Sequence, residues 1–183
     1  MTVRDIAITS AAMVQAESIE RILTENTDGA LTDADVRMLV RCVNLAIKEA
    51  CADGFPVCCD RELRANGKII PLDAFDPPPS LIRRVTRSGV PVRFAVDTDG
   101  IAVPRDGKYV VTYTVAPTDK NLDEAVTVGV LADTDMLAYL AARNFCLVTG
   151  RYDEATVWDG RYAAESEKKR ITRRAALRPR VWA

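Results

Sequence analysis

The residue types that most often carry chemistry are sparse in this chain of 183 residues. It has no histidine, which removes the commonest general base, proton shuttle and metal ligand. Cys58 and Cys59 are candidates for a redox or metal site. However, adjacent strand residues point to opposite faces, and no C-x-x-C pair completes a zinc site. We therefore interpret the five cysteines as structural thiols of a reducing cytoplasm: Cys42, Cys51, Cys58, Cys59 and Cys146.

Two acidic clusters, Asp97–Asp99 and Asp119–Glu124, have the ligand type that binds cations. They lack the twelve-residue spacing and the terminal glutamate of an EF-hand loop, so turn and capping roles are the better interpretation. The Asn-Gly and Asp-Gly pairs are turn formers, and none opens a helix after a strand, as a phosphate-binding loop must. The sequence thus predicts no enzyme, no cofactor and no metal site.

The C-terminal end is the strongest candidate for a binding segment. Of the 25 Lys and Arg residues, seven lie from Lys168 onward, where there is no acid; the residues before them carry the other 18 against all 26 acids. Two interpretations are open: a solvated helix end, where the helix dipole favours cations, or a contact with acidic protein or DNA. Trp182 offers a large apolar surface that is costly to expose, so we predict that it is an anchor.

The apolar pattern of the N-terminal part predicts two helices. Ser10–Thr24 and Asp33–Ala52 carry apolar residues at spacings of three and four, which is typical of helices with one buried face. Thr32 is the expected N-cap of the second helix. The second helix is apolar around so much of its circumference that we expect it to be largely buried.

A helical hairpin is expected near the other end of the chain. Asp133 or Thr134 can cap a helix to Val148, and Gly150 has the position of a left-handed C-cap. A second helix begins near Asp153. Its charged part beyond Glu165 has little reason to stay on the core. The positions expected in the core are Leu137, Leu140, Ala141, Phe145 and Val148 of the first helix and Ala155, Trp158 and Tyr162 of the second.

The block between the helical parts predicts one compact antiparallel sheet. An Asn66-Gly67 turn should join the first two strands into a hairpin, and Pro77–Pro79 should keep the segment after them irregular. The last strand should present Tyr109, Val111, Tyr113 and Val115 on one face. The expected strands are 57–63, 68–70, 81–87, 90–96, 101–103 and 108–115.

Together these elements predict an α+β fold, in which an α-helical bundle formed by the N- and C-terminal helices carries an inserted antiparallel β-sheet lobe. The expected parts are the N-terminal helices (1–56), the lobe (57–117), the C-terminal hairpin (118–175) and an extended tail (176–183). Hydrophobic content of 48% and charged content of 28% are ordinary for a globular protein. No apolar run approaches the roughly 20 residues that span a bilayer, so we expect no membrane contact.

Two segments carry a resemblance to a known family. They are RCVNLAIKEA (Arg41–Ala50) before the β block and YLAARNFCLVTGRYDEATVWDGRY (Tyr139–Tyr162) after it. This order resembles the head–tail adaptor (connector) proteins of tailed bacteriophages, including the tail-tubular adaptors of short-tailed phages. The likeness covers about Val36 to Glu167. Its best part is a small-residue helix, a Thr-Gly turn and Asp/Glu-x-Ala-x-x-Trp before a charged helix.

The resemblance implies a structural virion protein of the neck or connector region, made in the host cytoplasm. Such adaptors form a ring below the portal that matches its twelve-fold symmetry, which implies a dodecamer around a channel for DNA during genome ejection. Partners would be the portal, neighbouring copies, a downstream neck or tail protein, and DNA without sequence-specific contact. The alternative is a nucleic-acid-binding module that uses the basic helix. The predicted portal or partner contacts are Arg178, Pro179, Arg180, Val181 and Trp182, and the predicted portal- or channel-facing residues are Lys168, Lys169, Arg170, Arg173 and Arg174.

Overall fold

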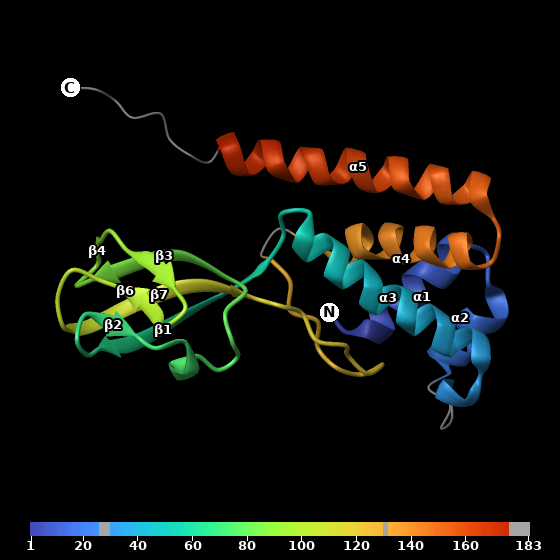
Figure 1. Cartoon of the computed structure of the whole chain (residues 1–183). Helices are drawn as coiled ribbons and strands as arrows, with labels where there is room; N and C mark the ends of the chain where they lie inside the picture. Colours follow the sequence, from blue (N-terminus) through green and yellow to red (C-terminus); the bar gives the residue numbers. More distant parts are fainter. Residues whose placement is uncertain (26–29, 130–131, 176–183) are drawn as a thin grey trace. The chain divides into compact units, whose positions relative to one another are not determined.

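The computed structural model describes residues 1–25, 30–129 and 132–175, the last four of these by backbone alone. The fold is α+β with helices at both ends of the chain, as predicted (Figure 1). The chain divides into two compact units. The helical unit joins Met1–Phe55 to the residues from Asp119 onward, and the β unit is Pro56–Thr118. These boundaries lie one residue outside the expected lobe of 57–117 at each end.

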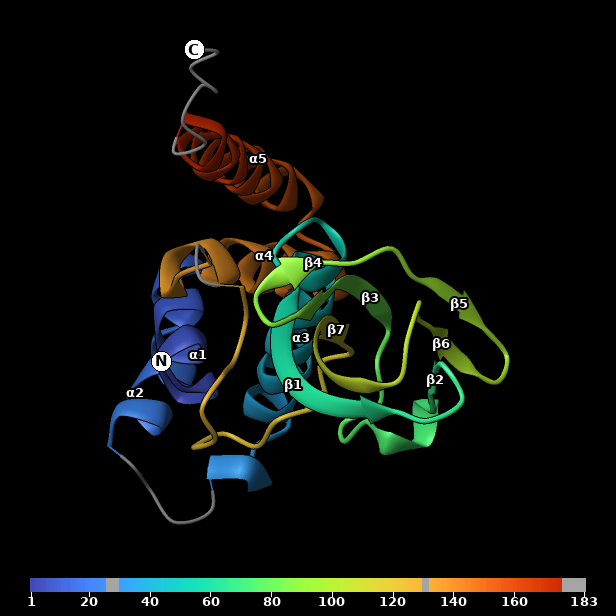
Figure 2. The same cartoon turned by 90° about the vertical axis from the view of Figure 1, so that its left-hand side faces the viewer.

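The helical unit is built around α4 (Thr134–Val148), which contacts α1 (Val3–Met13), α3 (Ala34–Ala52) and α5 (Tyr152–Ala175). Figure 2 shows α1 and α3 on the same side of α4, with α5 on the other side. The small residues Ala138, Ala141 and Ala142 let these helices approach α4 closely, and all three are fully buried. The apolar faces of all these helices meet in a single core.

The helix ends follow capping chemistry that was predicted only in part. Asp133 accepts a hydrogen bond from the Met136 amide at 3.0 Å, and Gly150 has a φ of 78°, so both ends of α4 are as expected. The N-cap of α3 is Asp33 and not Thr32. The Asp33 side chain accepts hydrogen bonds from the amides of Asp35 and Val36. Thr32 instead ends a short 3-10 turn, Ala30–Thr32.

The single helix expected over Ser10–Thr24 is wrong. A capping box between Thr2 and Asp5 starts α1 much earlier, at Val3, and α1 ends before α2 (Glu17–Thr24) begins. Between them Gln15 takes a φ of 56°, and the Ala16 amide bonds back to the Ala11 carbonyl at 2.9 Å. This is a Schellman ending in which glutamine occupies the position that usually holds glycine, so the common signal of a break is missing.

The β unit contains two small antiparallel sheets, not the one sheet expected. The first has the strand order β1 (Val57–Ala65), β7 (Gly107–Val115), β3 (Leu81–Arg87), β4 (Val90–Pro91). The second has the order β2 (Ile69–Ile70), β6 (Gly100–Ala102), β5 (Ala95–Asp97). The expected strand 90–96 is therefore divided between the two sheets as β4 and β5.

The expected Asn-Gly hairpin is correct as a turn and wrong as a strand pairing. Asn66 and Ile69 exchange backbone hydrogen bonds across the turn. Beyond them β1 pairs with β7 along its whole length, whereas β2 pairs with β6. Long-range pairing thus overrides the local turn signal. The prediction for β7 is confirmed, because Tyr109, Val111 and Tyr113 lie in the core of the unit and Val115 packs against it.

Truncating Trp158 should destabilise the protein. Trp158 of α5 stacks on Tyr139 of α4 with ring centroids 6.1 Å apart, as the predicted core assignment required. Because Trp158 is only partly buried, Trp158→Ala should cost about 2–3 kcal/mol of unfolding free energy, below the usual range for a buried Trp. Urea unfolding followed by circular dichroism measures this. Ile171→Ala, at an exposed position of the same helix, is the control, and equal effects of the two substitutions would contradict the packing role.

Removing the β unit should leave the helical unit folded. Val57 and Val115 are paired, so the chain enters and leaves the β unit at one place. Replacing Pro56–Thr118 with a flexible Gly/Ser linker of about eight residues should therefore close at little entropic cost. We expect a helical circular dichroism spectrum and cooperative thermal unfolding. A spectrum without that cooperativity would show that the helical core depends on the β unit.

Candidate interaction surfaces of the helical unit

The basic end of α5 is held on its own unit. Lys169, whose side chain is 17% exposed, pairs with Asp133 at the start of α4. Arg170 pairs with Asp53 at the end of α3 at 2.8 Å. The buried Ser166 lies in the same turn. The expectation that α5 leaves the core beyond Glu165 is therefore wrong as far as Arg170. The physical reason is that carboxylates at the ends of two other helices replace the missing apolar stripe.

The surroundings shift the pKa values of two groups in this contact, Asp133 and Tyr162. Burial acts to raise the pKa of Asp133, but the hydrogen bonds from Lys169 and from the Met136 amide outweigh it and hold that pKa below its ordinary value. Burial and the 2.7 Å hydrogen bond that Tyr162 donates to Asp53 raise the pKa of the Tyr162 phenol. Both groups therefore keep their usual charge state near neutral pH, with Asp133 ionised and Tyr162 protonated.

The other predicted site residues are not brought into this contact. Lys168 pairs with Glu165 one turn back, and its side chain is 74% exposed. Arg173 and Arg174 lie on the described backbone of α5, but nothing is described of their side chains. The predicted partner contacts, Arg178, Pro179, Arg180, Val181 and Trp182, lie outside the described residues. Their docking role stays a prediction.

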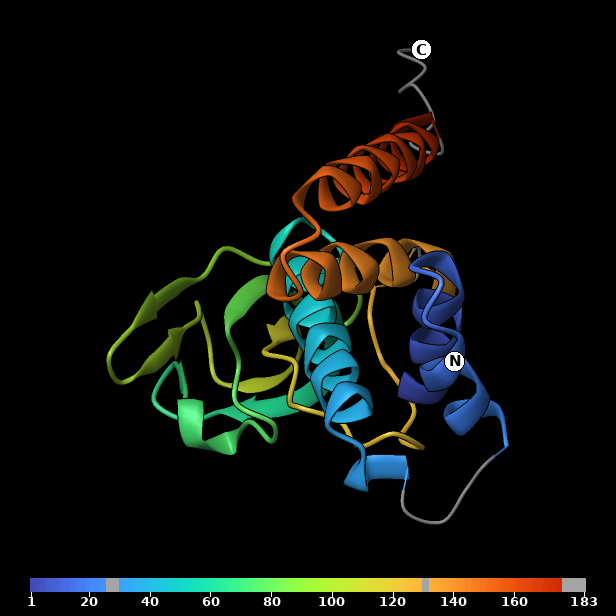
Figure 3. The same cartoon turned by 90° about the vertical axis from the view of Figure 1, so that its right-hand side faces the viewer.

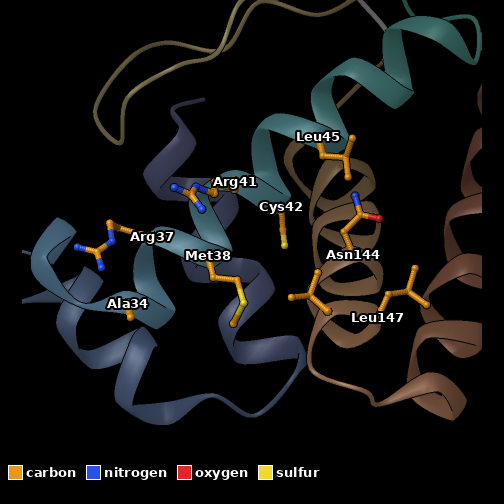
Figure 4. Close-up of a pocket in the computed structure, with 9 residues that line it drawn as sticks. Ala34, Arg37, Met38, Arg41, Cys42, Leu45, Asn144 and Leu147 are labelled. Atoms are coloured by element: carbon orange, nitrogen blue, oxygen red, sulfur yellow. The ribbon is translucent and has the colours of Figure 1, made fainter.

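A groove between α3 and the end of α4 was missed by the sequence analysis. It has a volume of about 620 Å³ (Figure 4). Its apolar residues Leu45, Leu147 and Val148 are 46–64% exposed. The assignment of Val148 to the core is therefore wrong, because the last turn of α4 buries Phe145 and Cys146 while Val148 lies on its groove side. The groove is lined by Ala34, Arg37, Met38, Arg41, Cys42, Leu45, Asn144, Leu147 and Val148.

The sequence did contain a signal for this groove. Arg37, Arg41 and Leu45 follow one another at intervals of four, and all three are exposed on a helix whose other faces are largely buried. The same three residues also line an adjoining cleft beside Lys48 and Asp119. One face of α3 thus connects the two hollows.

The groove has a surplus of positive charge. Its lining contains two guanidinium groups and no carboxylate. Arg37 donates to the backbone carbonyls of Leu31 and Thr32, and within the described residues neither Arg37 nor Arg41 has a carboxylate partner. In the adjoining cleft the Asp119 carboxylate is already paired with Lys48 at 2.7 Å.

Nothing in the groove is arranged as a nucleophile. Burial, followed by the nearby Cys146 and Glu49, raises the pKa of the Cys42 thiol to about 11, so Cys42 stays protonated near neutral pH. Beside it, Arg143 binds Glu49 at 2.6 Å and Asp159 at 3.0 Å, which ties α3, α4 and α5 together. These groups stabilise the wall of the groove, and the groove itself is suited to binding.

Among the described residues, no group of three or more His, Cys, Asp or Glu side chains could hold a metal ion. In the same part of the chain, no helix combines the length and apolar character needed to cross a membrane. Comparison of the sequence with family models and with curated proteins gives no match.

The contact between Lys169 and Asp133 should make stability depend on pH. Because the folded-state pKa of Asp133 is lowered, its charged form stabilises the fold above the unfolded-state pKa of about 3.9, and this is lost as the pH falls through the lower folded value. Lys169→Met should therefore cost about 0.5–1 kcal/mol at pH 6 and less at pH 3. Urea unfolding at both pH values measures the difference, with the exposed Lys168→Met as control. A loss of equal size at the two pH values would contradict the ion pair.

Proposed function

We propose that this protein is a structural virion protein, a head–tail adaptor that docks as a ring beneath the portal of a tailed bacteriophage. It would connect the portal to the next neck or tail component and leave a channel for DNA. In this role the subunit works through surfaces that bind other proteins, and the proposal assigns it no enzymatic step.

The observation that supports this proposal is how the two segments that carry the resemblance are used. Both belong to the helical unit, and the whole β unit is inserted between them. Their small residues pack α4 against its neighbours, Gly150 turns the chain, and Ala155 and Trp158 seat α5 on α4. The shared pattern thus specifies a packed helical scaffold with uncovered outer faces, which suits a subunit of an assembly.

The alternative, a nucleic-acid-binding module, has less support from the described residues. It depends on the basic helix, yet Lys169 and Arg170 are already paired with carboxylates of their own unit. A phosphate backbone would have to compete with these intramolecular partners. Binding of free DNA by the isolated protein, weakening steeply with added salt, would favour this alternative over the adaptor.

The adaptor proposal predicts a complex with the portal protein of the same phage. Native mass measurement of the mixture should show several copies of this chain on one portal ring. Deleting Arg178–Ala183 should weaken that binding by about thirtyfold or more, because a buried aromatic anchor contributes about 2 kcal/mol.

Two outcomes test the adaptor function and the role of Trp182 separately. If the intact protein fails to bind the portal, the adaptor function is wrong. If the truncated protein binds as well as the intact one in low and in moderate salt, the adaptor function stands but Trp182 is not the anchor. Arg21→Ala, which removes a positive charge at an exposed position of α2 outside the predicted contacts, is the control for a general loss of charge.

A further inference from the structure

The lining of the α3–α4 groove suits a partner with both apolar and acidic groups. Leu45, Leu147 and Val148 form a contiguous exposed apolar wall, and such patches on soluble proteins often mark binding sites. Arg37 and Arg41 stand beside that wall without a carboxylate partner among the described residues. A ligand that covers the wall and supplies an acid would satisfy both features together.

The same unit has a second exposed surface with the matching chemistry. Asp153, Val157, Gly160 and Ala164 recur along α5 at intervals of four, three and four, so they form one ridge, and all four are exposed. The ridge lies opposite Ala155, which is buried. The Asp153 carboxylate has no cationic partner within the described residues, and Val157 is 54% exposed.

Gly160 lacks an explanation within the subunit. A Cβ atom built there meets nothing within 4 Å, so packing in this chain does not require glycine. Glycine in an exposed helix interior costs about 1 kcal/mol relative to alanine. Its one structural effect is to leave the helix backbone bare between Val157 and Ala164. A bare stretch of this kind permits close approach of another backbone.

We propose that these two surfaces bind each other between copies of this chain. The α5 ridge of one copy lies in the α3–α4 groove of the next, where Val157 covers the apolar wall and Asp153 pairs with Arg37 and Arg41. This is recognition of a helix by an apolar groove, with the charges setting its direction. The inference rests on the proposed function in that it supplies the contact between neighbouring subunits of the ring.

The placement of the two surfaces makes the contact head-to-tail. Figure 3 shows α5 and α3 on opposite sides of α4, and the ridge faces away from α4 while the groove opens between α3 and α4. Two different patches of one subunit therefore meet. A contact of this heterologous kind leaves a free groove and a free ridge at each step, so further copies can add, and a ring forms where the rotation between copies closes.

Exchange of the two charges tests this inference. Arg41→Glu and Asp153→Arg should each weaken self-association by at least about tenfold, because each places like charges opposite one another. The chain with both substitutions should regain most of the wild-type association. In each contact the acid then lies in the groove, at position 41, and the base lies on the ridge, at position 153. Sedimentation velocity at concentrations up to about 100 μM measures this, a range that detects contacts of micromolar strength.

Two controls and a third variant separate binding from folding. Arg21→Glu and Glu17→Arg reverse the same charges at exposed positions of α2 and should leave association unchanged. Gly160→Leu should raise the thermal midpoint, because it removes a helix glycine, and should weaken association, because it fills the bare stretch. The proposal is overturned if the wild-type chain remains a monomer, or if the double variant associates no better than the single ones. Portal binding of the same variants, measured separately, tests the adaptor function and not this contact.

Discussion

The distal half of α5 is attached to the helical unit through Asp53, the residue that ends α3. Its carboxylate accepts a hydrogen bond from Tyr162 and pairs with Arg170, two turns further along α5. A short helix-end residue thereby fixes the distal half of a helix that has few apolar residues of its own. Two residues later, Phe55 is the last residue of the N-terminal segment of the unit, so α5 is attached close to the point where the chain leaves the helical core.

The segment that leads back from the β unit into the helical unit is hydrogen-bonded close to Asp53, at Phe55. The Gly129 amide donates to the Phe55 carbonyl at 2.9 Å, and a Cβ atom at residue 129 would lie 2.9 Å from the carbonyl carbon of Phe55. Only glycine allows the two backbone segments to approach this closely. The helical unit therefore closes the gap that the insertion opens. This closure explains physically why an α-helical core can be built from two ends of a chain separated by 63 residues of β structure.

Local chemistry made part of this structure predictable. The spacing of apolar residues and the caps at Asp133 and Gly150 identified α4, because both signals lie within a few residues of the feature that they predict. The Gln15 break and the division into two sheets were missed because tertiary contacts decide them: glutamine adopts a left-handed conformation without a glycine signal, and β2 pairs with β6 some thirty residues away.

The candidate surfaces were harder to predict, for a related reason. The density of basic residues predicted a binding site at the end of α5. In the structure, however, Lys169 and Arg170 of that end are paired with Asp133 and Asp53. Arg37 and Arg41 lie in a segment of nearly balanced charge, yet they line the groove without a carboxylate partner among the described residues. What a surface can bind depends on which charges lack partners after folding, and the sequence gives only where the charges are. Among the described residues, the cations without a carboxylate partner that line a groove lie on the exposed face of α3, whereas Lys169 and Arg170 of the basic end are paired.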